Sequence, residues 1–346
     1  VTTHPAVVGA VAAEVRRAGG VAVVADSPGG GLPYTRATLE RCYRRAGYAA
    51  LEAEGLVELN YDLSHAEVYH ADGKVTRRFN VITPVREADC VINICKLKTH
   101  AFTCLTGAVK NIFGVVPGLD KPAFHGRLRT VDLFAEMLLD VAAYVRPAFS
   151  IMDAVVAMEG NGPGLGTPRK VGLLLGAFSP LAVDVAAGVI TGLPAARHPV
   201  LRAAAGRGWT PTTPDDLAVA GCPLETAPDW RWPPTVVAEH GFAGFGPFQG
   251  VLSRVFREGF TVRPAINKRR CVGCGKCTEA CPVDAVTVGE TAARVDDRRC
   301  IRCYCCHEAC AYDAITLRGG VARRVQAFLA SVSREKLPPG AGRGRM

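Results

Sequence analysis

The sequence predicts an α/β domain, in which a mainly parallel sheet is flanked by helices, followed by a small α+β domain. Two observations lead to this prediction. Over the first 221 residues, short apolar runs alternate with amphipathic helix patterns, which is typical of a sheet covered by helices on both faces. Between residues 271 and 317, one cysteine-rich unit occurs twice. The chain is therefore expected to hold two different folding units.

The elements of the larger unit are predicted from apolar periodicity and from residues that stop a helix. Helical periodicity covers residues 4–18, 129–144 and 180–190, and the first two stretches stop at Gly19-Gly20 and before Pro147. Apolar runs typical of buried strands cover residues 21–25, 90–94, 149–152 and 171–175. Strands and helices alternate, so we expect connections that cross over and a mainly parallel sheet.

The duplicated unit carries eight of the fourteen cysteines, and its two copies lie 29 positions apart. Each copy reads C-x2-C-x2-C-x3-C, which is the spacing that holds a [4Fe–4S] cluster in bacterial ferredoxins. In that arrangement the fourth cysteine of each copy binds the other cluster. The predicted ligands of one cluster are Cys271, Cys274, Cys277 and Cys310. Those of the second cluster are Cys300, Cys303, Cys306 and Cys281.

Other uses of these cysteines fit less well. Zinc takes four ligands, and the duplicated spacing differs from that of ordinary zinc sites. Disulfides would need an oxidising compartment, for which the sequence has no signal. Cys305 adjoins Cys306 but lies outside the spacing, so we interpret it as a bystander. The sequence thus predicts two [4Fe–4S] clusters and transfer of electrons.

Four parts of the chain follow from these patterns. Residues 1–221 form the α/β domain, and residues 222–262, which are rich in Pro, Trp and Gly, form a linker and wrapping segment. Residues 263–318 form the two-cluster ferredoxin-like domain. Residues 319–346 are predicted to hold a basic helix, at about 321–334, and a tail.

Composition limits the classes of partner. The apolar runs are too short to span a bilayer, and no basic start followed by an apolar stretch is present, so we expect a cytoplasmic protein. The net charge of +9 comes mostly from arginines scattered along the chain, which does not favour nucleic-acid binding. It favours anionic substrates or acidic electron donors and acceptors. The oligomeric state is not predicted.

A second group of residues stands out against this composition. Arginine outnumbers lysine by 32 to 9, yet four lysines fall within 26 residues. Lysine is a compact charge whose pKa falls on burial, so it can act as an acid, a base or an anion ligand. This stretch begins at the end of the predicted strand 90–94, and two aspartates follow other strands. Polar groups at such strand ends are expected to meet at one edge of the sheet. The predicted catalytic residues are Lys96, Lys98, His100, Lys110, Asp26 and Asp153.

The glycine-rich stretch 160–166 has two interpretations. It could present N–H groups to a phosphate or carboxylate, or it could be a tight connecting loop. It matches neither a P-loop nor a dinucleotide fingerprint. Flavin sites have no reliable short motif, so the sequence leaves a bound flavin open.

Three motifs resemble those of the family named domain of unknown function 362. They are Lys96-Leu97-Lys98-Thr99-His100, Gly107-Ala108-Val109-Lys110-Asn111-Ile112-Phe113-Gly114 and Met158-Glu159-Gly160-Asn161-Gly162-Pro163. The resemblance covers nearly the whole chain, about residues 2–317, and implies an iron–sulfur protein with a C-terminal two-cluster domain. Family members usually have a strand upstream of the segment Thr3–Pro5, so the α/β domain is expected to lack its first strand.

Three functions remain open from the sequence. The first is an iron–sulfur reductase that passes low-potential electrons to a small anionic substrate in the α/β crevice. The second is an electron-transfer or scaffold subunit that docks a partner enzyme. The third is a ligase or transferase whose clusters are structural or sensory. The first is favoured because the lysines and His100 could neutralise and protonate a reduced substrate.

Overall fold

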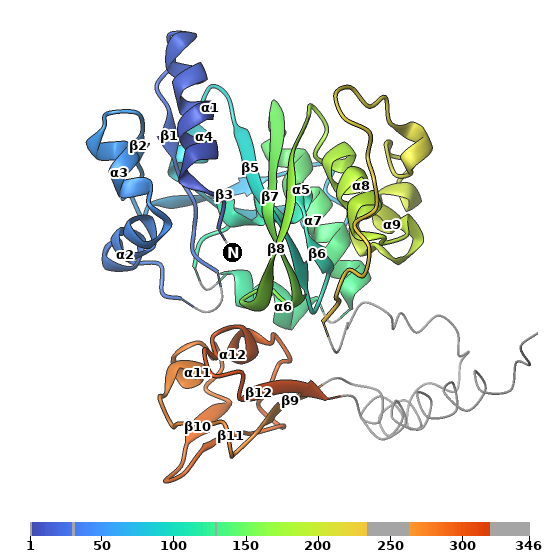
Figure 1. Cartoon of the computed structure of the whole chain (residues 1–346). Helices are drawn as coiled ribbons and strands as arrows, with labels where there is room; N and C mark the ends of the chain where they lie inside the picture. Colours follow the sequence, from blue (N-terminus) through green and yellow to red (C-terminus); the bar gives the residue numbers. More distant parts are fainter. Residues whose placement is uncertain (1, 30–31, 119, 129, 234–262, 319–346) are drawn as a thin grey trace, which may run out of the picture.

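The computed structural model describes residues 2–29, 32–118, 120–128, 130–233 and 263–318, and Figure 1 shows their arrangement. In chain order the first elements are α1 (Pro5–Arg17), β1 (Val23–Val24), α2 (Arg36–Ala46), α3 (Tyr48–Ala53), β2 (Glu58–Leu59), β3 (His65–Tyr69), β4 (Arg78–Ile82), α4 (Thr83–Glu87), β5 (Ile92–His100) and β6 (Cys104–Thr106). They are followed by α5 (Ala108–Ile112), η1 (Phe113–Val115), α6 (Asp120–Arg127), α7 (Val131–Val145), β7 (Phe149–Asn161), β8 (Leu165–Ala177), α8 (Pro180–Thr191), η2 (Ala195–Arg197), α9 (Pro199–Gly206) and η3 (Pro214–Asp216). The cysteine-rich domain contains β9 (Arg263–Ile266), α11 (Lys276–Glu279), β10 (Val286–Val288), β11 (Ala293–Val295), α12 (Cys305–Glu308) and β12 (Ile315–Arg318).

The central sheet has four strands in the order β6-β5-β7-β8. Only β5 and β7 are parallel, and both outer pairs are antiparallel. The α/β class is therefore supported, but a mainly parallel sheet is not confirmed, because this sheet is mixed. Connection length explains the difference. Three residues join β5 to β6 and three join β7 to β8, whereas a parallel crossover needs a dozen or more.

Two strands are longer than the apolar runs that predicted them. β7 continues from residue 149 to Asn161 and turns directly into β8, so the glycine-rich stretch 160–166 is the end of a hairpin. Gly162 is required there, because a Cβ atom would lie 1.9 Å from the carbonyl oxygen of Thr99. Of the two interpretations of this stretch, the connecting loop is the one that the backbone adopts.

The predicted strand at residues 21–25 is short and lies outside the central sheet. β1 pairs in parallel with β2, and Val23 is 52% exposed. The apolar run was expected to be buried, which is wrong for this valine. A second core lies beside it, formed by α1, α2, α3 and β2 through residues such as Leu39, Tyr43 and Leu51, and Ile94 of β5 packs against this core.

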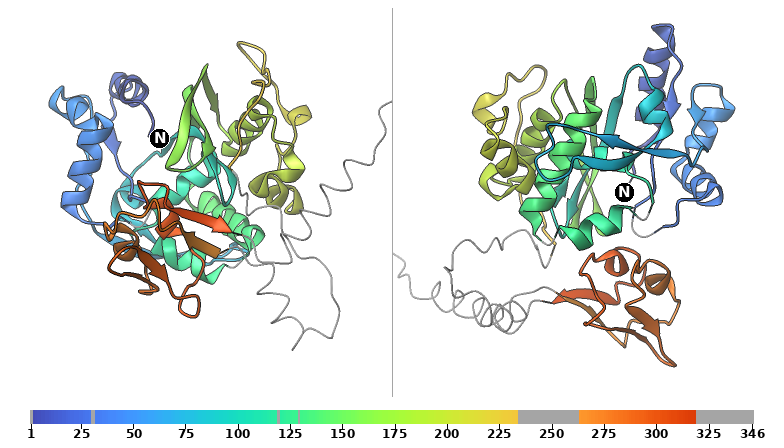
Figure 2. Two further views of the ribbon diagram at one scale, coloured as in Figure 1. Left: turned by 60° about the horizontal axis from the view of Figure 1, so that its bottom comes forward. Right: turned by 180° about the vertical axis from the view of Figure 1, so that it is seen from behind.

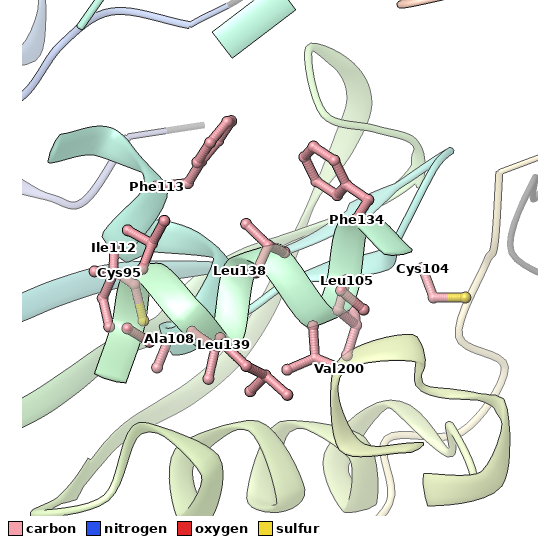
Figure 3. Close-up of a cluster of buried hydrophobic side chains, with 14 of the residues drawn as sticks. Cys95, Cys104, Leu105, Ala108, Ile112, Phe113, Phe134, Leu138, Leu139 and Val200 are labelled. Carbon is pink, nitrogen blue, oxygen red and sulfur yellow. The ribbon is translucent and has the colours of Figure 1, made fainter. Parts of the chain in front are cut away.

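The main core lies between the central sheet and helices α5, α7, α8 and α9 (Figure 3). Helix α7 begins at Thr130, whose hydroxyl oxygen accepts a hydrogen bond from the Leu133 N–H group, as is typical of a helix N-cap. Phe134 and Leu138 on α7 are fully buried. Burial of each such side chain stabilises the fold by roughly 1.5–3 kcal/mol. This packing fixes the position of β5 and α5, which carry the predicted lysines.

The cysteine-rich domain contacts one end of the α/β domain, below α6 in Figure 1, and the rear view in Figure 2 agrees. Its outer strands, β9 and β12, pair antiparallel. Tyr304 and Leu317 from this domain are members of the main core. Of the predicted linker, residues 222–233 are described, and Ala227 donates its N–H to the Ile190 carbonyl along α8. The rest of the linker and the predicted basic helix lie outside the described residues.

Candidate functional site

The first cysteine unit surrounds a cavity. Its empty volume is about 360 Å³, part of which is open to solvent. The cavity is lined by Cys271, Cys274 and Cys277 from the first unit and by Cys310 from the second. These four thiols could therefore hold one iron–sulfur cluster.

The four remaining thiols of the repeat form a second group. Burial raises the pKa of the Cys306 thiol, and the neighbouring thiols Cys303, Cys300, Cys277 and Cys281 raise it further. Burial likewise raises the pKa of the Cys277 thiol, and the neighbouring thiols Cys271, Cys274 and Cys310 raise it further. Each of these two buried thiols thus lies near those with which it would share a cluster, and Cys277 and Cys306 also lie near each other.

The surroundings of the thiols fit an iron–sulfur cluster. The backbone N–H group of Ala285 donates a 3.2 Å hydrogen bond to the sulfur of Cys281, and that of Ala314 donates a 3.3 Å hydrogen bond to the sulfur of Cys310. Such donors favour the thiolate, which is the form that binds iron. Within the described ranges, no three His, Cys, Asp or Glu side chains are arranged around a single metal ion.

The two copies of the repeat have different surroundings. Lys276 and Glu279 of the first copy are exposed. The residues 29 positions later are Cys305, which is 5% exposed, and Glu308, whose side chain is 18% exposed. The first copy therefore borders solvent, and the second borders the α/β domain.

Tyr304 anchors the second copy in the main core. It stands where the first copy has Gly275, and both residues have a left-handed backbone, with φ of 62° and 77°. This conformation costs a non-glycine residue roughly 1–2 kcal/mol. The Tyr304 side chain is buried, and its ring centroid lies 6.1 Å from that of Phe102. Packing across the two domains thus holds an unfavourable backbone conformation in place.

Glu308 brings the second copy into contact with the predicted lysine–histidine stretch. A carboxylate oxygen of Glu308 lies 3.5 Å from Nε2 of His100. Nδ1 of His100 accepts a hydrogen bond of 3.0 Å from the Phe102 N–H group. Nδ1 therefore carries no proton, and the proton of the neutral ring is on Nε2, which faces Glu308. Burial lowers the pKa of His100 well below its usual value, and Lys110 and other nearby cations lower it further.

Two lysines complete this group, which we call the polar cluster: Lys98, His100, Lys110 and Glu308. Lys98 and Lys110 keep some contact with solvent. Burial lowers the pKa of Lys110 to about 8, against the opposing effect of Glu308. Burial also lowers the pKa of Lys98, although Asp26 and Glu308 favour its charged form. Conversely, burial raises the pKa of Glu308, and Lys110 is the strongest opposing charge. Burial thus shifts the pKa of each group of the polar cluster toward its uncharged form, close to the second cysteine unit.

Asp26 lies near this cluster, on the side of Lys121. Burial is the main cause that raises the pKa of Asp26, and Lys121 and Lys98 oppose it. By surface area, however, Asp26 is exposed. Because water touches this carboxylate, we attribute no stability cost to the shift. Lys121 is buried, and its ammonium group donates to the carbonyl oxygens of Ser27 and Gly114, so it ties the loop after β1 to η1 and α6.

Lys96 and Asp153 form a separate buried pair. Nζ of Lys96 lies 2.5 Å from Oδ2 of Asp153, which also accepts a hydrogen bond from the His4 N–H group. Burial would raise the pKa of Asp153, but the hydrogen bonds from Lys96, His4 and Val155 together lower it. This pair joins β5 and β7 to the start of α1.

The six predicted catalytic residues thus fall into two groups. Lys98, His100 and Lys110 meet in the polar cluster, with Asp26 as an electrostatic neighbour of Lys98, whereas Lys96 contacts Asp153. The lysines were expected beyond the strand, but β5 runs on to His100. Because side chains alternate along a strand, residues 96, 98 and 100 share one face.

Sequence reasoning missed Glu308 and Tyr304. The only signal for Tyr304 was a tyrosine at the repeat position of Gly275. Nothing distinguishes Glu308 from Glu279 in the sequence, since both follow the same spacing. His125 lies outside the three family motifs. Its ring centroid lies 4.3 Å from that of Phe134, and burial and the nearby Lys110 lower its pKa to about 4.

The glycine-rich hairpin also contacts the cysteine-rich domain. The side-chain amide of Asn161 donates a 3.1 Å hydrogen bond to a carboxylate oxygen of Asp313. The tip of the β7–β8 hairpin and His100 of the polar cluster therefore contact the same small domain.

Comparison with known families agrees with this architecture. Residues 1–188 match the family described as domain of unknown function (DUF362), and residues 263–311 match the 4Fe-4S dicluster domain. The chain belongs to the DUF362 family. The resemblance seen in the sequence is thereby confirmed, and the second match indicates iron–sulfur electron transfer by this DUF362 protein.

A relative of the DUF362 chain is a cyanobacterial protein. The "Thylakoid-associated protein sll1697" of Synechocystis sp. (strain ATCC 27184 / PCC 6803 / Kazusa) is 33% identical over 261 residues, which are 75% of this chain and 76% of the relative. Among the described residues, no helix of the DUF362 protein is long and apolar enough to cross a membrane.

Proposed function

We propose that this protein passes low-potential electrons through two [4Fe–4S] clusters to a small anionic molecule at the polar cluster. Bound clusters supply one-electron steps at low potential. The thiolates of Cys271, Cys274, Cys277 and Cys310 would hold the first cluster. Those of Cys300, Cys303, Cys306 and Cys281 would hold the second. The bound flavin that the sequence leaves open is not needed for this proposal.

The observation that carries the proposal is the contact between His100 and Glu308. Glu308 follows Cys306 by two residues, and its carboxylate lies 3.5 Å from the imidazole of His100. The second cysteine unit is thus the part of its domain that adjoins ionisable groups of the α/β domain. An electron leaving this unit toward the α/β domain would arrive beside them.

The polar cluster has the groups that reduction of an anion requires. Reduction adds negative charge, which nearby cations stabilise and proton donors neutralise. Lys98 and Lys110 provide the cations, and a lysine whose pKa is about 8, as for Lys110, can release a proton near neutral pH. Nε2–H of His100 is a further donor. Asp26 favours the charged form of Lys98, and Lys96 with Asp153 would position β5.

A reoxidation assay tests the proposal. Anaerobically prepared protein, its iron content measured, is reduced with dithionite and mixed with small anions that contain a reducible bond, such as 2-oxo carboxylates or unsaturated carboxylates. We expect one class to restore the absorbance of the oxidised clusters. Lys98→Met and Lys110→Met should slow this step at least tenfold at unchanged iron content, and Lys170→Met, at an exposed lysine of β8, should not.

Two results would contradict the proposal. One is reduced protein that no small anion reoxidises, and the other is equal rates in the Lys98, Lys110 and Lys170 variants. Reoxidation by a partner enzyme alone would favour the alternative of an electron-transfer subunit. We expect the protein in the cytoplasm, where free thiols persist.

A further inference from the structure

We propose that the face around the first cysteine unit docks an acidic one-electron carrier protein, which exchanges electrons with the first cluster. This inference rests on the proposed electron transfer and adds the entry surface and the chemistry of the partner. Three features of that face support it: its accessibility, its exposed apolar side chains and its charge.

Accessibility differs between the copies of the repeat. Cys274 is exposed, and the cavity that it lines is partly open to solvent. Its counterpart in the second copy is Cys303, which is 8% exposed. Transfer of an electron between two proteins requires a short distance. Because the first unit is exposed, a partner can approach it directly. The second unit is covered by the α/β domain.

Apolar side chains surround the open cavity. Val272 and Tyr312 line it and are 59% and 51% exposed. Val288, 40% exposed, lies next to Gly273 at the same cavity. These are the large hydrophobic residues that the cysteine-rich domain leaves exposed within residues 263–318. Their gathering at one place is typical of an interaction surface.

The charge beside the cavity is positive. Residues 268–276 contain four cations, Lys268, Arg269, Arg270 and Lys276, and no acid. Arg270 pairs with Asp313, whereas the side chains of Lys268, Arg269 and Lys276 are exposed. In the second copy, the position of Lys268 is occupied by Asp297, which pairs with Arg302 and Arg263. Exposed acids are also present on the first unit, at Glu279 on α11.

These features select an acidic partner. Transient electron-transfer complexes have small interfaces, with an apolar centre and charges that steer the approach. Here the centre is Val272, Tyr312 and the cavity, and the exposed cations Lys268, Arg269 and Lys276 are beside it. The step itself transfers one electron: the reduced carrier is oxidised, the first cluster is reduced, and no proton moves.

The test uses the full chain with its clusters and a plant-type [2Fe–2S] ferredoxin as the acidic probe. Stopped-flow mixing gives the rate of cluster reduction, and calorimetry gives the affinity, both at low and high salt. The variant is the triple charge reversal Lys268→Glu, Arg269→Glu, Lys276→Glu. The control is the triple reversal Arg44→Glu, Lys170→Glu, Arg298→Glu, which changes net charge equally at exposed residues that do not line the cavity. Arg298 is the repeat counterpart of Arg269.

We expect the first triple variant to lower the association rate at least tenfold and to lose most of the salt dependence, since steering is screened by salt. The control should stay within about twofold, because none of its three residues lines the cavity. Val272→Ser should increase the dissociation rate severalfold with its charge unchanged. Reduction by dithionite, a small molecule, should be equal in all variants.

Three results would overturn the docking face. They are equal losses in both triple variants, a slower rate fully explained by a changed cluster potential in a redox titration, or sedimentation showing that this face joins two copies of the chain. None of these measurements includes a small substrate, so the docking face and the reductase proposal can fail separately.

Discussion

The imidazole Nε2 of His100 lies 3.5 Å from a carboxylate oxygen of Glu308, across the boundary between the α/β domain and the cysteine-rich domain. The two residues are 208 positions apart in the sequence. The Phe102 N–H group donates a hydrogen bond to Nδ1 of His100, so the ring proton is on Nε2. The carboxylate of the second cysteine unit is therefore presented with an N–H donor and two lysines.

Removal of this carboxylate should loosen the domain contact. In Glu308→Gln, Lys98 and Lys110 each lose a nearby anion, and we expect the contact to weaken by about 1–3 kcal/mol. Hydrogen exchange should then rise in β5 near His100 and in α12. Glu279→Gln, the repeat counterpart at an exposed site, is the control. Equal exchange in the two variants would show that Glu308 does not hold the domains together.

The buried side chain of Tyr304 should stabilise the fold by more than its left-handed backbone conformation costs. In Tyr304→Gly the left-handed conformation becomes unstrained, a gain of about 1–2 kcal/mol, but a buried aromatic ring is lost from the main core, at about 3–5 kcal/mol. We expect net destabilisation and faster proteolysis between the domains. Tyr304→Phe, which keeps the buried ring, should lose less stability than Tyr304→Gly. A glycine variant as stable as the parent would mean that the ring contributes nothing to the contact.

Local chemistry accounts for what the sequence predicted. The spacing from Cys271 to Cys310 is contained in two short units, and the helix at 180–190 follows from its own periodicity, as α8 confirms. The direction of the strands was not predicted correctly, because the apolar runs 149–152 and 171–175 leave 18 residues between them, whereas only three residues join β7 to β8.

The remaining features depend on contacts between distant segments. Glu279 and Glu308 occupy the same place in a repeat, and only the docking of one copy against β5 makes them different. In the same way, Lys96 and Lys98 are two residues apart on one strand, but Lys96 forms an ion pair with Asp153, whereas Lys98 belongs to the polar cluster. Such choices are made by tertiary packing, which no local pattern records.

The Lys96–Asp153 pair should behave as one unit. Both side chains are buried, and loss of one partner leaves a buried charge without its counterion, at about 3–5 kcal/mol. We expect Lys96→Met and Asp153→Asn each to lower the unfolding midpoint strongly. The double variant should be less destabilised than the sum of the two, as chemical denaturation of matched samples would measure. Additive effects would argue against direct coupling.

His198 should make stability depend on pH. It is 1% exposed, and burial lowers its pKa to about 4. The unfolded chain, with a histidine pKa of about 6.5, therefore binds more protons between pH 4 and 6.5. The contribution of His198 to the free energy of unfolding is fully present above pH 6.5. It is lost as the pH falls toward 4, at about 1.4 kcal/mol per pH unit.

His198 is the N-cap of α9, where its side chain accepts a hydrogen bond from the Leu201 N–H group. The comparison variant is His198→Asn, because asparagine also caps a helix and has no titrating ring. Between pH 7.5 and 5.5, the thermal midpoint of the parent should fall by a few degrees more than that of the variant at one scan rate. Parallel changes in the two proteins would show that His198 is charged in the folded state.

Single cysteine variants should separate the two clusters. If the fourth cysteine of each unit binds the other cluster, Cys310→Ser removes the first cluster and Cys281→Ser the second, and each halves the iron content. Because the first cavity is open to solvent, the cluster left in Cys281→Ser should react faster with an external carrier than the one left in Cys310→Ser. Cys305→Ser should keep all iron, since this buried thiol lies outside the spacing. Iron loss in Cys305→Ser, or the reverse order of reactivity, would require a different set of ligands.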